Sequence, residues 1–213
     1  LTKTRDNRIF FLSSQAVERI SELKYENGSW VEYVHVEYPP SYGGSSIRAV
    51  DLDNDGVDEI IVTHGDNGDF VSMPLRPYHG IRVYKLEPGK KLEMTFFYPM
   101  YGAYKMAIAD FDRDGYPDIA ATAYFYDKKS ANPQKMVMLI SQKGKAYSAC
   151  TLTAAHQGRW MAIDAEDING DGLPDLILGG AYFANFEMGN ADGLADPKKR
   201  AALLILRSEL NGQ

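Results

Sequence analysis

The feature that most constrains this chain is an acidic pattern that occurs three times in its 213 residues. Each copy has the form Asp-x-Asp/Asn-x-Asp-Gly-x-x-Asp/Glu, and the copies begin at Asp51, Asp110 and Asp167. Successive copies therefore start 59 and 57 residues apart. A regular period of this length indicates a repeat architecture. We expect the chain to consist of successive copies of one structural unit.

Each period has the pattern of four short β-strands. An apolar stretch precedes the acidic pattern, a β-rich run follows it, and two alternating segments come next. The segments after the pattern are residues 60–63, 81–86 and 92–97 in the first copy, and residues 119–122, 136–140 and 147–152 in the second. Hairpin turns are expected at Gly28, Gly89 and Gly144. Four antiparallel strands per repeat is the composition of a β-propeller blade, so we predict an all-β propeller fold.

The repeats divide the chain into blades. We predict one partial β-propeller domain over residues 1–213, with repeats at approximately 1–40 (an incomplete blade), 41–100, 101–155 and 156–213. In the incomplete blade, residues 9–12, 17–23 and 30–36 are interpreted as the second, third and fourth strands, with the first strand and the acidic loop missing. Residues 202–206 are interpreted as a third strand.

About three and a half blades are too few to close most rings, which have four to eight. We therefore expect the remaining blades to come from a longer chain. The alternative is a half-ring that pairs with a second copy.

The acidic pattern offers oxygen ligands at alternate positions 1, 3, 5 and 9, and a glycine at position 6 permits a sharp turn. Calcium binds six to eight oxygens, and a backbone carbonyl at position 7 would complete the set. Solvated turns are the alternative, because Asp and Gly are common turn residues. Three copies in register favour calcium, at about three sites. The predicted ligands are Asp51, Asp53, Asp55, Val57 and Glu59; Asp110, Asp112, Asp114, Tyr116 and Asp118; and Asp167, Asn169, Asp171, Leu173 and Asp175.

An EF-hand is excluded by the end of the pattern. It requires a bidentate Glu at position 12 and a helix on each side. Position 12 is Val62, Ala121 or Leu178, and the flanking segments have strand patterns. The last ligand comes at position 9 instead, so the loop is of a different kind.

Composition limits the partners. The net charge of −6 and the lack of a large Lys/Arg cluster argue against nucleic acid. No run of 18 apolar residues is present, so no membrane span is expected. The single cysteine, Cys150, rules out a disulfide within the chain, and we expect it to be a small buried residue in a strand.

The acidic pattern, followed by an apolar strand and repeated about every 58 residues, resembles the FG-GAP/VCBS repeat family, which is related to the integrin α-subunit propeller. The resemblance implies calcium binding, a seven-bladed ring, and a role in adhesion or in binding a protein or glycan. It also implies a secreted, periplasmic or cell-surface location, with no signal peptide present in this chain. Asn169 and Glu59 depart from the commonest residues, but both still offer an oxygen ligand.

Three segments outside the acidic loops are candidates for a role beyond calcium binding. The long loop between the second and third strands of one blade carries His64, Asp66, Asn67, Tyr78, His79 and Arg82. Some polysaccharide lyases on calcium-containing propellers use His, Tyr and Arg, so this loop gives an alternative function as part of a carbohydrate-active enzyme. The alternative is that these residues only order the loop.

Arg159 and Trp160 form the second candidate, because they could stack on a sugar ring. Packing between blades is the competing interpretation for this tryptophan. Residues 182–197 form a further loop, either a binding rim or an insertion. The pattern does not identify a catalytic residue, and a binding module is favoured over an enzyme.

Overall fold

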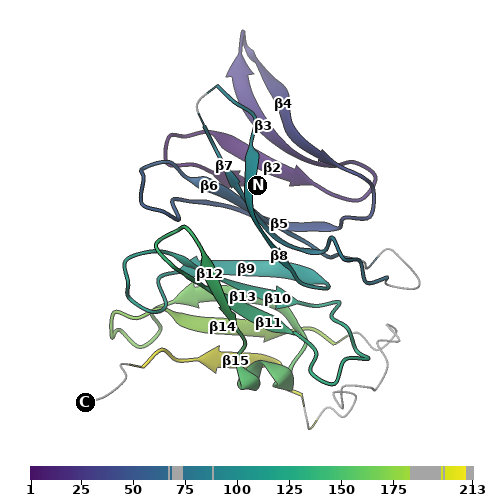
Figure 1. The fold of residues 1–213 in the computed structure, drawn as a ribbon, viewed down its shortest axis with the longest axis vertical. Helices are drawn as coiled ribbons and strands as arrows, with labels where there is room; N and C mark the ends of the chain where they lie inside the picture. Colours follow the sequence, from purple (N-terminus) through teal and green to yellow (C-terminus); the bar gives the residue numbers. More distant parts are fainter. Residues whose placement is uncertain (67, 69–73, 88, 183–197, 199, 210–213) are drawn as a thin grey trace.

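Four antiparallel sheets follow one another along the chain, and each is built from strands that are consecutive in sequence (Figure 1). The computed structural model describes residues 1–66, 68, 74–87, 89–182, 198 and 200–209. Within this part of the chain, strands dominate and the only helix is one short 3-10 turn. The predicted all-β fold of antiparallel blades is confirmed, and the described sheets do not close a ring.

The strands have the following bounds. The first sheet contains β1 (Thr2–Lys3), β2 (Ile9–Ser13), β3 (Glu18–Glu26) and β4 (Ser29–Tyr38). The second contains β5 (Gly44–Val50), β6 (Glu59–His64), β7 (Gly80–Lys85) and β8 (Glu93–Pro99). The third contains β9 (Ala103–Ala109), β10 (Asp118–Ala123), β11 (Met136–Ser141) and β12 (Tyr147–Cys150). After helix η1 (Thr153–Gln157), the fourth contains β13 (Trp160–Glu166), β14 (Asp175–Gly180) and β15 (Leu203–Leu206).

The prediction that the first blade lacks its first strand is wrong. Its first strand is present, because Thr2 and Lys3 of β1 pair with Phe10 and Ile9 of β2. Two residues are too few to show an alternating pattern, so no local signal marks this strand. The predicted absence of an acidic loop is correct, since β1 and β2 are joined by a short turn in which the Thr4 N–H donates to the Arg8 carbonyl.

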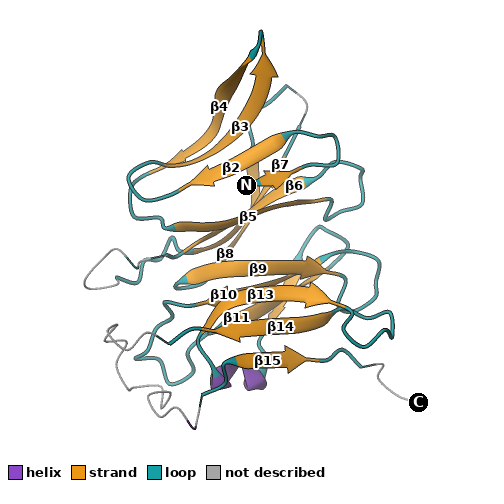
Figure 2. Cartoon of the chain, turned by 180° about the vertical axis from the view of Figure 1, so that it is seen from behind, coloured by secondary structure: helices purple, strands orange, loops and turns teal. Residues whose placement is uncertain are grey.

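The sheets stack face to face, as the views from both sides show (Figures 1 and 2). Three apolar clusters fill the spaces between successive sheets. Phe10 and Ile20 of the first sheet pack with Ile60 of the second, and all three are fully buried. Ile81 and Ile119 belong to the next cluster, between the second and third sheets. Burial between sheets therefore holds the blades in sequence order.

The outermost strand of the third sheet, β12, contains the single cysteine of the chain. β12 is the last strand of the third sheet and pairs only with β11. Cys150 lies in this strand, as predicted, but it is exposed, so the prediction of a buried cysteine was wrong. Cys150 is the last residue of this edge strand, and its exposure is something that the local pattern could not reveal.

Candidate metal centre

The three acidic loops join the first and second strands of the second, third and fourth sheets, and their backbone hydrogen bonds are the same in each. The position-5 N–H donates to the position-1 carboxylate at 3.0, 3.2 and 3.1 Å in the three loops. The position-6 glycine N–H donates to the other oxygen of the same carboxylate at 3.0, 2.9 and 2.8 Å. Asp51, Asp110 and Asp167 therefore fix the turn in each copy.

The turn requires two residues in the left-handed region. At position 4, Asn54 and Arg113 have φ of 59° and 64°, and Gly170 has φ of 78°. At position 6, Gly56 and Gly115 have φ of 90° and 88°. Glycine adopts this conformation without steric cost, which is why the pattern carries it there. In this backbone the position-3 side-chain oxygen also accepts the position-5 N–H, at 3.2, 3.1 and 3.0 Å in the three loops.

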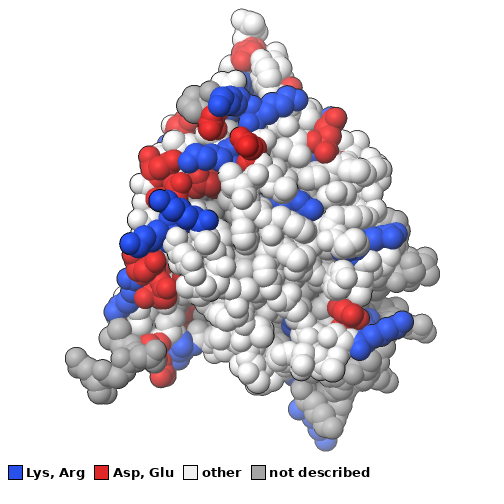
Figure 3. Space-filling view, in the orientation of Figure 1, with Lys and Arg blue, Asp and Glu red and all other residues white. Residues whose placement is uncertain are grey.

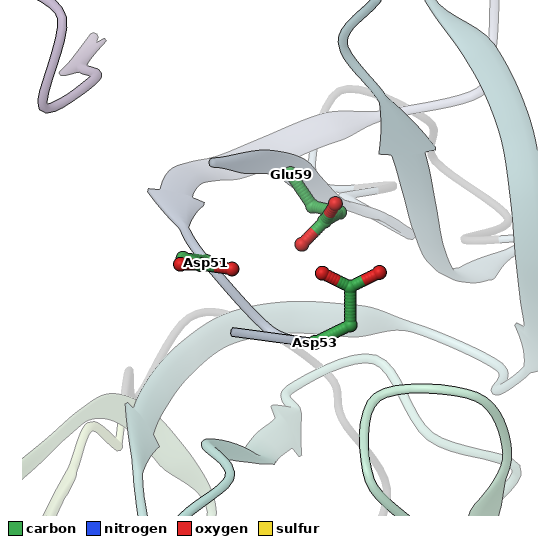
Figure 4. Close-up of side chains that lie close together, drawn as sticks. All are labelled: Asp51, Asp53 and Glu59. Atoms are coloured by element: carbon green, nitrogen blue, oxygen red, sulfur yellow. The ribbon is translucent and has the colours of Figure 1, made fainter. Parts of the chain in front are cut away.

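In the first two loops the carboxylates of positions 1, 3 and 9 converge. One oxygen from each of Asp51, Asp53 and Glu59 lies within 4.8 Å of the others (Figure 4), and a second group has the same property. The second group is Asp110, Asp112 and Asp118. Figure 4 shows the carboxylates of Asp53 and Glu59 facing each other. Three anionic groups this close repel one another unless a cation or protons compensate their charge.

The third loop has the same frame with one amide in place of a carboxylate. The Asn169 side-chain N–H donates to Asp171 at 2.8 Å, while its oxygen accepts the Asp171 N–H at 3.0 Å. Three backbone N–H groups donate to Asp167, and those from Gly172 and Gly170 help to hold its pKa below the usual value. An anion is thus stabilised at position 1 of this loop.

The position-9 residues differ between the first loop and the others. In Asp118 one oxygen accepts the Phe111 N–H and the other the Ser141 N–H, at 2.9 and 2.7 Å. Asp175 is bonded in the same way, by the N–H groups of Ile168 and Ser208 at 3.3 and 2.8 Å.

In the first loop, Glu59 accepts the Leu52 N–H through Oε2 at 2.8 Å, whereas its buried Oε1 has no hydrogen-bond partner. Burial raises the pKa of Glu59 to about 7, and the neighbouring Asp53 and Asp55 carboxylates add to this shift.

These donor sets fit calcium. All of the side chains offer hard oxygen ligands, which calcium prefers, and those of positions 1, 3 and 9 converge in the first two loops. The buried Oε1 of Glu59 supports this, because a carboxylate oxygen left without a partner in a protein interior is unfavourable unless a ligand engages it. At position 7, the N–H groups of Val57, Tyr116 and Leu173 donate to the position-5 aspartates at 2.9 Å. Their carbonyl oxygens stay predicted ligands.

Neighbouring blades meet at these loops. The Asn54 side chain of the first loop donates to the carbonyl of Gly115 in the second loop at 2.8 Å. The turn between β11 and β12 also touches the first loop, because a Cβ added to Gly144 would lie 2.3 Å from the Cβ of Asp53. The geometry of one loop is therefore coupled to the blade that follows it.

We expect Gly144→Ala to lower the free energy of unfolding by about 1–3 kcal/mol more than Gly28→Ala does, because overpacking at Gly144 forces the turn away from the first loop. Gly28 is a matched control: it has φ of +83°, against +69° for Gly144, but nothing lies within 4 Å of the position that an added Cβ would take. Urea unfolding of both variants measures the difference. Equal losses would mean that the contact with Asp53 is unimportant.

The residues of the long loop after β6 come together, but in the interior. His64 and His79 are fully buried and Arg82 is 6% exposed. The Arg82 guanidinium lies 3.2 Å from Nδ1 of His64 and donates to the Tyr78 carbonyl at 2.6 Å. Asp66 is only half-buried, and its carboxylate accepts the Gly68 N–H at 3.0 Å. Asn67 lies outside the described residues.

Aromatic rings surround this cluster. The Tyr42 ring stacks on that of Tyr78 with their centroids 4.3 Å apart, and the guanidinium of Arg82 lies 4.4 Å from the centroid of Phe97. The Tyr78 hydroxyl also bonds to the Ser41 hydroxyl at 3.0 Å. These contacts favour the interpretation in which the long loop is ordered by its own polar and aromatic groups.

The second candidate segment is also buried. Trp160 is fully buried within the cluster between the third and fourth sheets, and its indole N–H donates to the Ala155 carbonyl at 2.7 Å. Arg159 is 8% exposed. Trp160 therefore packs between blades and is not available to stack on a sugar. The loop at residues 183–197 lies outside the described residues.

Two cationic residues at the first loop were missed by the sequence reasoning. Arg5 donates to Asp51 and to Asp58, with both contacts at 3.0 Å, and the Lys85 ammonium lies 2.8 Å from Asp55. Arg5 comes from the turn after β1 and Lys85 from the end of β7. Only the register of β7 against β6 could have indicated Lys85, since Tyr84 pairs with Ile60 and Lys85 follows beside Glu59.

The comparisons with known proteins agree with the fold and the loops. Residues 102–135 match the FG-GAP repeat family, and this segment contains the whole second acidic loop. The chain is also similar to integrin alpha-5 of Xenopus laevis, with 27% identity over 164 residues. The alignment covers 67% of this chain and 15% of that protein, so the chain spans a small part of the relative's length. The predicted resemblance to FG-GAP repeats and to the integrin α-subunit is thereby confirmed, with the FG-GAP match at residues 102–135.

Proposed function

We propose that this chain is part of a calcium-stabilised, integrin-like β-propeller that presents its loops to a protein or glycan ligand outside the cytoplasm. The observation that carries this proposal is the identical hydrogen-bond frame of three loops, together with the convergence of the position-1, position-3 and position-9 carboxylates in the first two. A frame repeated in three blades is unnecessary for turns that only need to be solvated. The similarity to an integrin α-subunit supports the role in adhesion.

Calcium bound in these loops would stabilise the folded blades. Positions 1, 3, 5 and 9 and the position-7 carbonyl would hold one ion in each loop and fix the hairpin between the first two strands of a blade. Binding would also compensate the repulsion between the converging carboxylates. Because Asn54 bonds to the second loop, an ion in one loop would restrain its neighbour as well.

Binding is supported over catalysis by the burial of the long-loop residues. A lyase would need His64 or His79 at the surface, with Arg82 near the sugar carboxylate. Both histidines are fully buried and Arg82 contacts the protein's own groups. The alternative function as part of a carbohydrate-active enzyme therefore has no observation in its favour among the described residues.

Further blades fit the outer face of the fourth sheet. Leu204 and Leu206 of β15 pack toward the third sheet, so Leu203 and Ile205 point to the other face. These two side chains are 60% and 44% exposed. An apolar face of this kind would be covered by the next blade of a longer chain, or by a second copy.

No helix in the described residues is long and apolar enough to cross a membrane.

Thermal unfolding tests the calcium proposal. After removal of metal with EDTA, we expect the melting temperature to rise as calcium is added from micromolar to millimolar concentrations, because an ion that binds only the folded state stabilises it. One site at a hundredfold excess over its Kd contributes about 2.7 kcal/mol. Magnesium should be much less effective, since it demands shorter bonds and a stricter octahedral geometry than these loops offer.

One variant tests the second loop, and a second variant serves as its control. Asp110→Asn should reduce the calcium-dependent rise, because it weakens the second loop. Asp164→Asn removes the same charge from an exposed position in β13, outside the loops, and should leave the rise unchanged. If calcium shifts the melting temperature of none of these proteins, the loops are solvated turns and the proposal fails.

A further inference from the structure

The first acidic loop differs from the other two because a lysine of its own blade lies on its carboxylates. The Lys85 ammonium is 2.8 Å from Oδ2 of Asp55 and 3.5 Å from Oδ2 of Asp53. These aspartates occupy positions 5 and 3 of the loop, so the lysine bonds two of the side chains that are predicted to bind calcium. The pKa of Lys85 is raised, chiefly by its hydrogen bond to Asp55.

The internal repeat provides two reference loops. Lys85 stands beside the position-9 residue Glu59, one residue after the pair Ile60–Tyr84. The same place in the third sheet holds Ile140, after the pair Ile119–Leu139, and its side chain packs against the apolar core.

In the fourth sheet the place holds Arg207, after the pair Leu176–Leu206. Arg207 is exposed, and among the described residues it forms no ion pair with the third loop. The described residues thus show a cation on positions 3 and 5 in the first loop alone.

We propose that Lys85 is a built-in competitor of calcium, so that the first loop is a lysine–calcium exchange site and the last of the three to fill. This inference rests on the proposed calcium-binding function and adds an order of binding to it. The ammonium and a divalent cation cannot share Asp53 and Asp55, because the two positive charges would lie a few ångströms apart and repel each other. Calcium must therefore displace the lysine, whereas the second and third loops require no displacement.

The lysine has room to leave. Its side chain is 35% exposed and lines a cavity of about 260 Å³ between the second and third sheets. Thr95, Phe96 and Tyr147 line the same cavity. Figure 3 shows that Lys/Arg and Asp/Glu side chains lie side by side along one edge of the molecule. Exchange thus requires one side chain to move and leaves the blade intact.

Arg5 does not have the same role. It bonds Asp58, which lies outside the predicted ligand set, and Oδ2 of Asp51, which also accepts the Gly56 N–H. Its backbone N–H donates to Asp58 at 2.6 Å as well. Arg5 thereby ties the first sheet to the loop, and it is left unchanged in the variants below.

Calorimetric titration of the metal-free chain with calcium chloride, at fixed ionic strength, tests the order of binding. For the native chain we expect two tighter sites and one site that is weaker by at least about tenfold. Lys85→Ile gives the first loop the residue that the third sheet carries in this place, and it should tighten the weak site by about tenfold or more. Lys91→Ile removes the same charge from an exposed position in the connection between β7 and β8 and should change no site.

A second measurement follows the native lysine directly. When lysines are reductively methylated with carbon-13, the Lys85 methyl resonance, assigned by its loss in Lys85→Ile, should move only as the third calcium equivalent binds. Movement with the first equivalent would overturn the order.

Three equal sites in the native chain, unchanged by Lys85→Ile, would overturn the lysine inference while leaving calcium binding intact. Absence of calcium binding in both proteins would overturn the proposed function itself.

Discussion

Replacing Trp160 by alanine should lower the free energy of unfolding by about 3–5 kcal/mol, the usual loss for a buried tryptophan. Trp160 is fully buried between the third and fourth sheets, in contact with the cluster that contains Met136 and Leu178. Its removal leaves a cavity at the contact between two blades and leaves the Ala155 carbonyl without its indole donor. Urea unfolding followed by circular dichroism measures the loss.

Trp30 is the matched control, because the chain has only two tryptophans. Trp30 lies in β4, is 60% exposed, and contacts the ring of Tyr25 edge-on at 5.3 Å. We expect Trp30→Ala to cost less than about 1 kcal/mol, since the change at an exposed site creates no cavity. A similar loss in both variants would show that the contact between the third and fourth sheets contributes little to stability.

The acidic loops could be predicted from sequence because every determinant is local. The carboxylate of Asp51 is fixed by the N–H groups of residues four and five positions later, and the same holds for Asp110. The glycine at position 6 adopts the left-handed conformation that closes this turn, and it does so without steric cost. Local rules of this kind repeat wherever the pattern repeats, so the blades and their order followed from it.

Features that depend on contacts between residues far apart in the chain could not be predicted from the sequence. Arg5 reaches the first loop from a residue 46 positions before Asp51 in the chain. Lys85 acquires its role only from the register of β7, and Cys150 its exposure from the position of β12 in the sheet. The burial of the histidines and the arginine in the long loop could not be predicted for a related reason, because residue type alone does not distinguish a surface His–Arg group from a buried one. Burial of His64 and Arg82 depends on how three strands and a loop pack.

That buried cluster makes the fold sensitive to acid. The pKa of His79 is lowered to about 4, chiefly by burial; the Ser41 backbone opposes this shift, and Arg76 and Arg82 add to it. Burial likewise places the pKa of His64 well below its usual value, with Arg82 and then His79 as the next causes. Tyr38 and Tyr42 face His64 with their rings and supply no carboxylate to compensate a positive charge.

The direction in which stability changes with pH follows from whether the folded or the unfolded chain binds more protons. Above pH 6.5 each histidine is neutral in both the folded and the unfolded chain, so its contribution to stability does not change. As the pH falls from about 6.5 to 4, the unfolded chain binds a proton at His79 and the folded chain does not, so stability falls by up to about 3 kcal/mol. His64 adds a loss of the same sign. Glu59 acts in the opposite direction between about pH 7 and 4.5, because its pKa is raised in the folded chain.

Comparison of variants separates these effects. We expect His79→Gln to reduce the dependence of unfolding free energy on pH between 6.5 and 4, measured by urea unfolding at half-unit intervals in calcium-free buffer. Glu59 is unchanged in the variant, so its contribution cancels in the difference. His156→Gln serves as the control, since His156 is only half-buried and its side chain lies outside this cluster. If His79→Gln and the native chain lose stability in parallel as the pH falls, His79 takes up its proton over the same pH range in the folded and the unfolded chain, and its burial beside Arg82 does not exclude the charge.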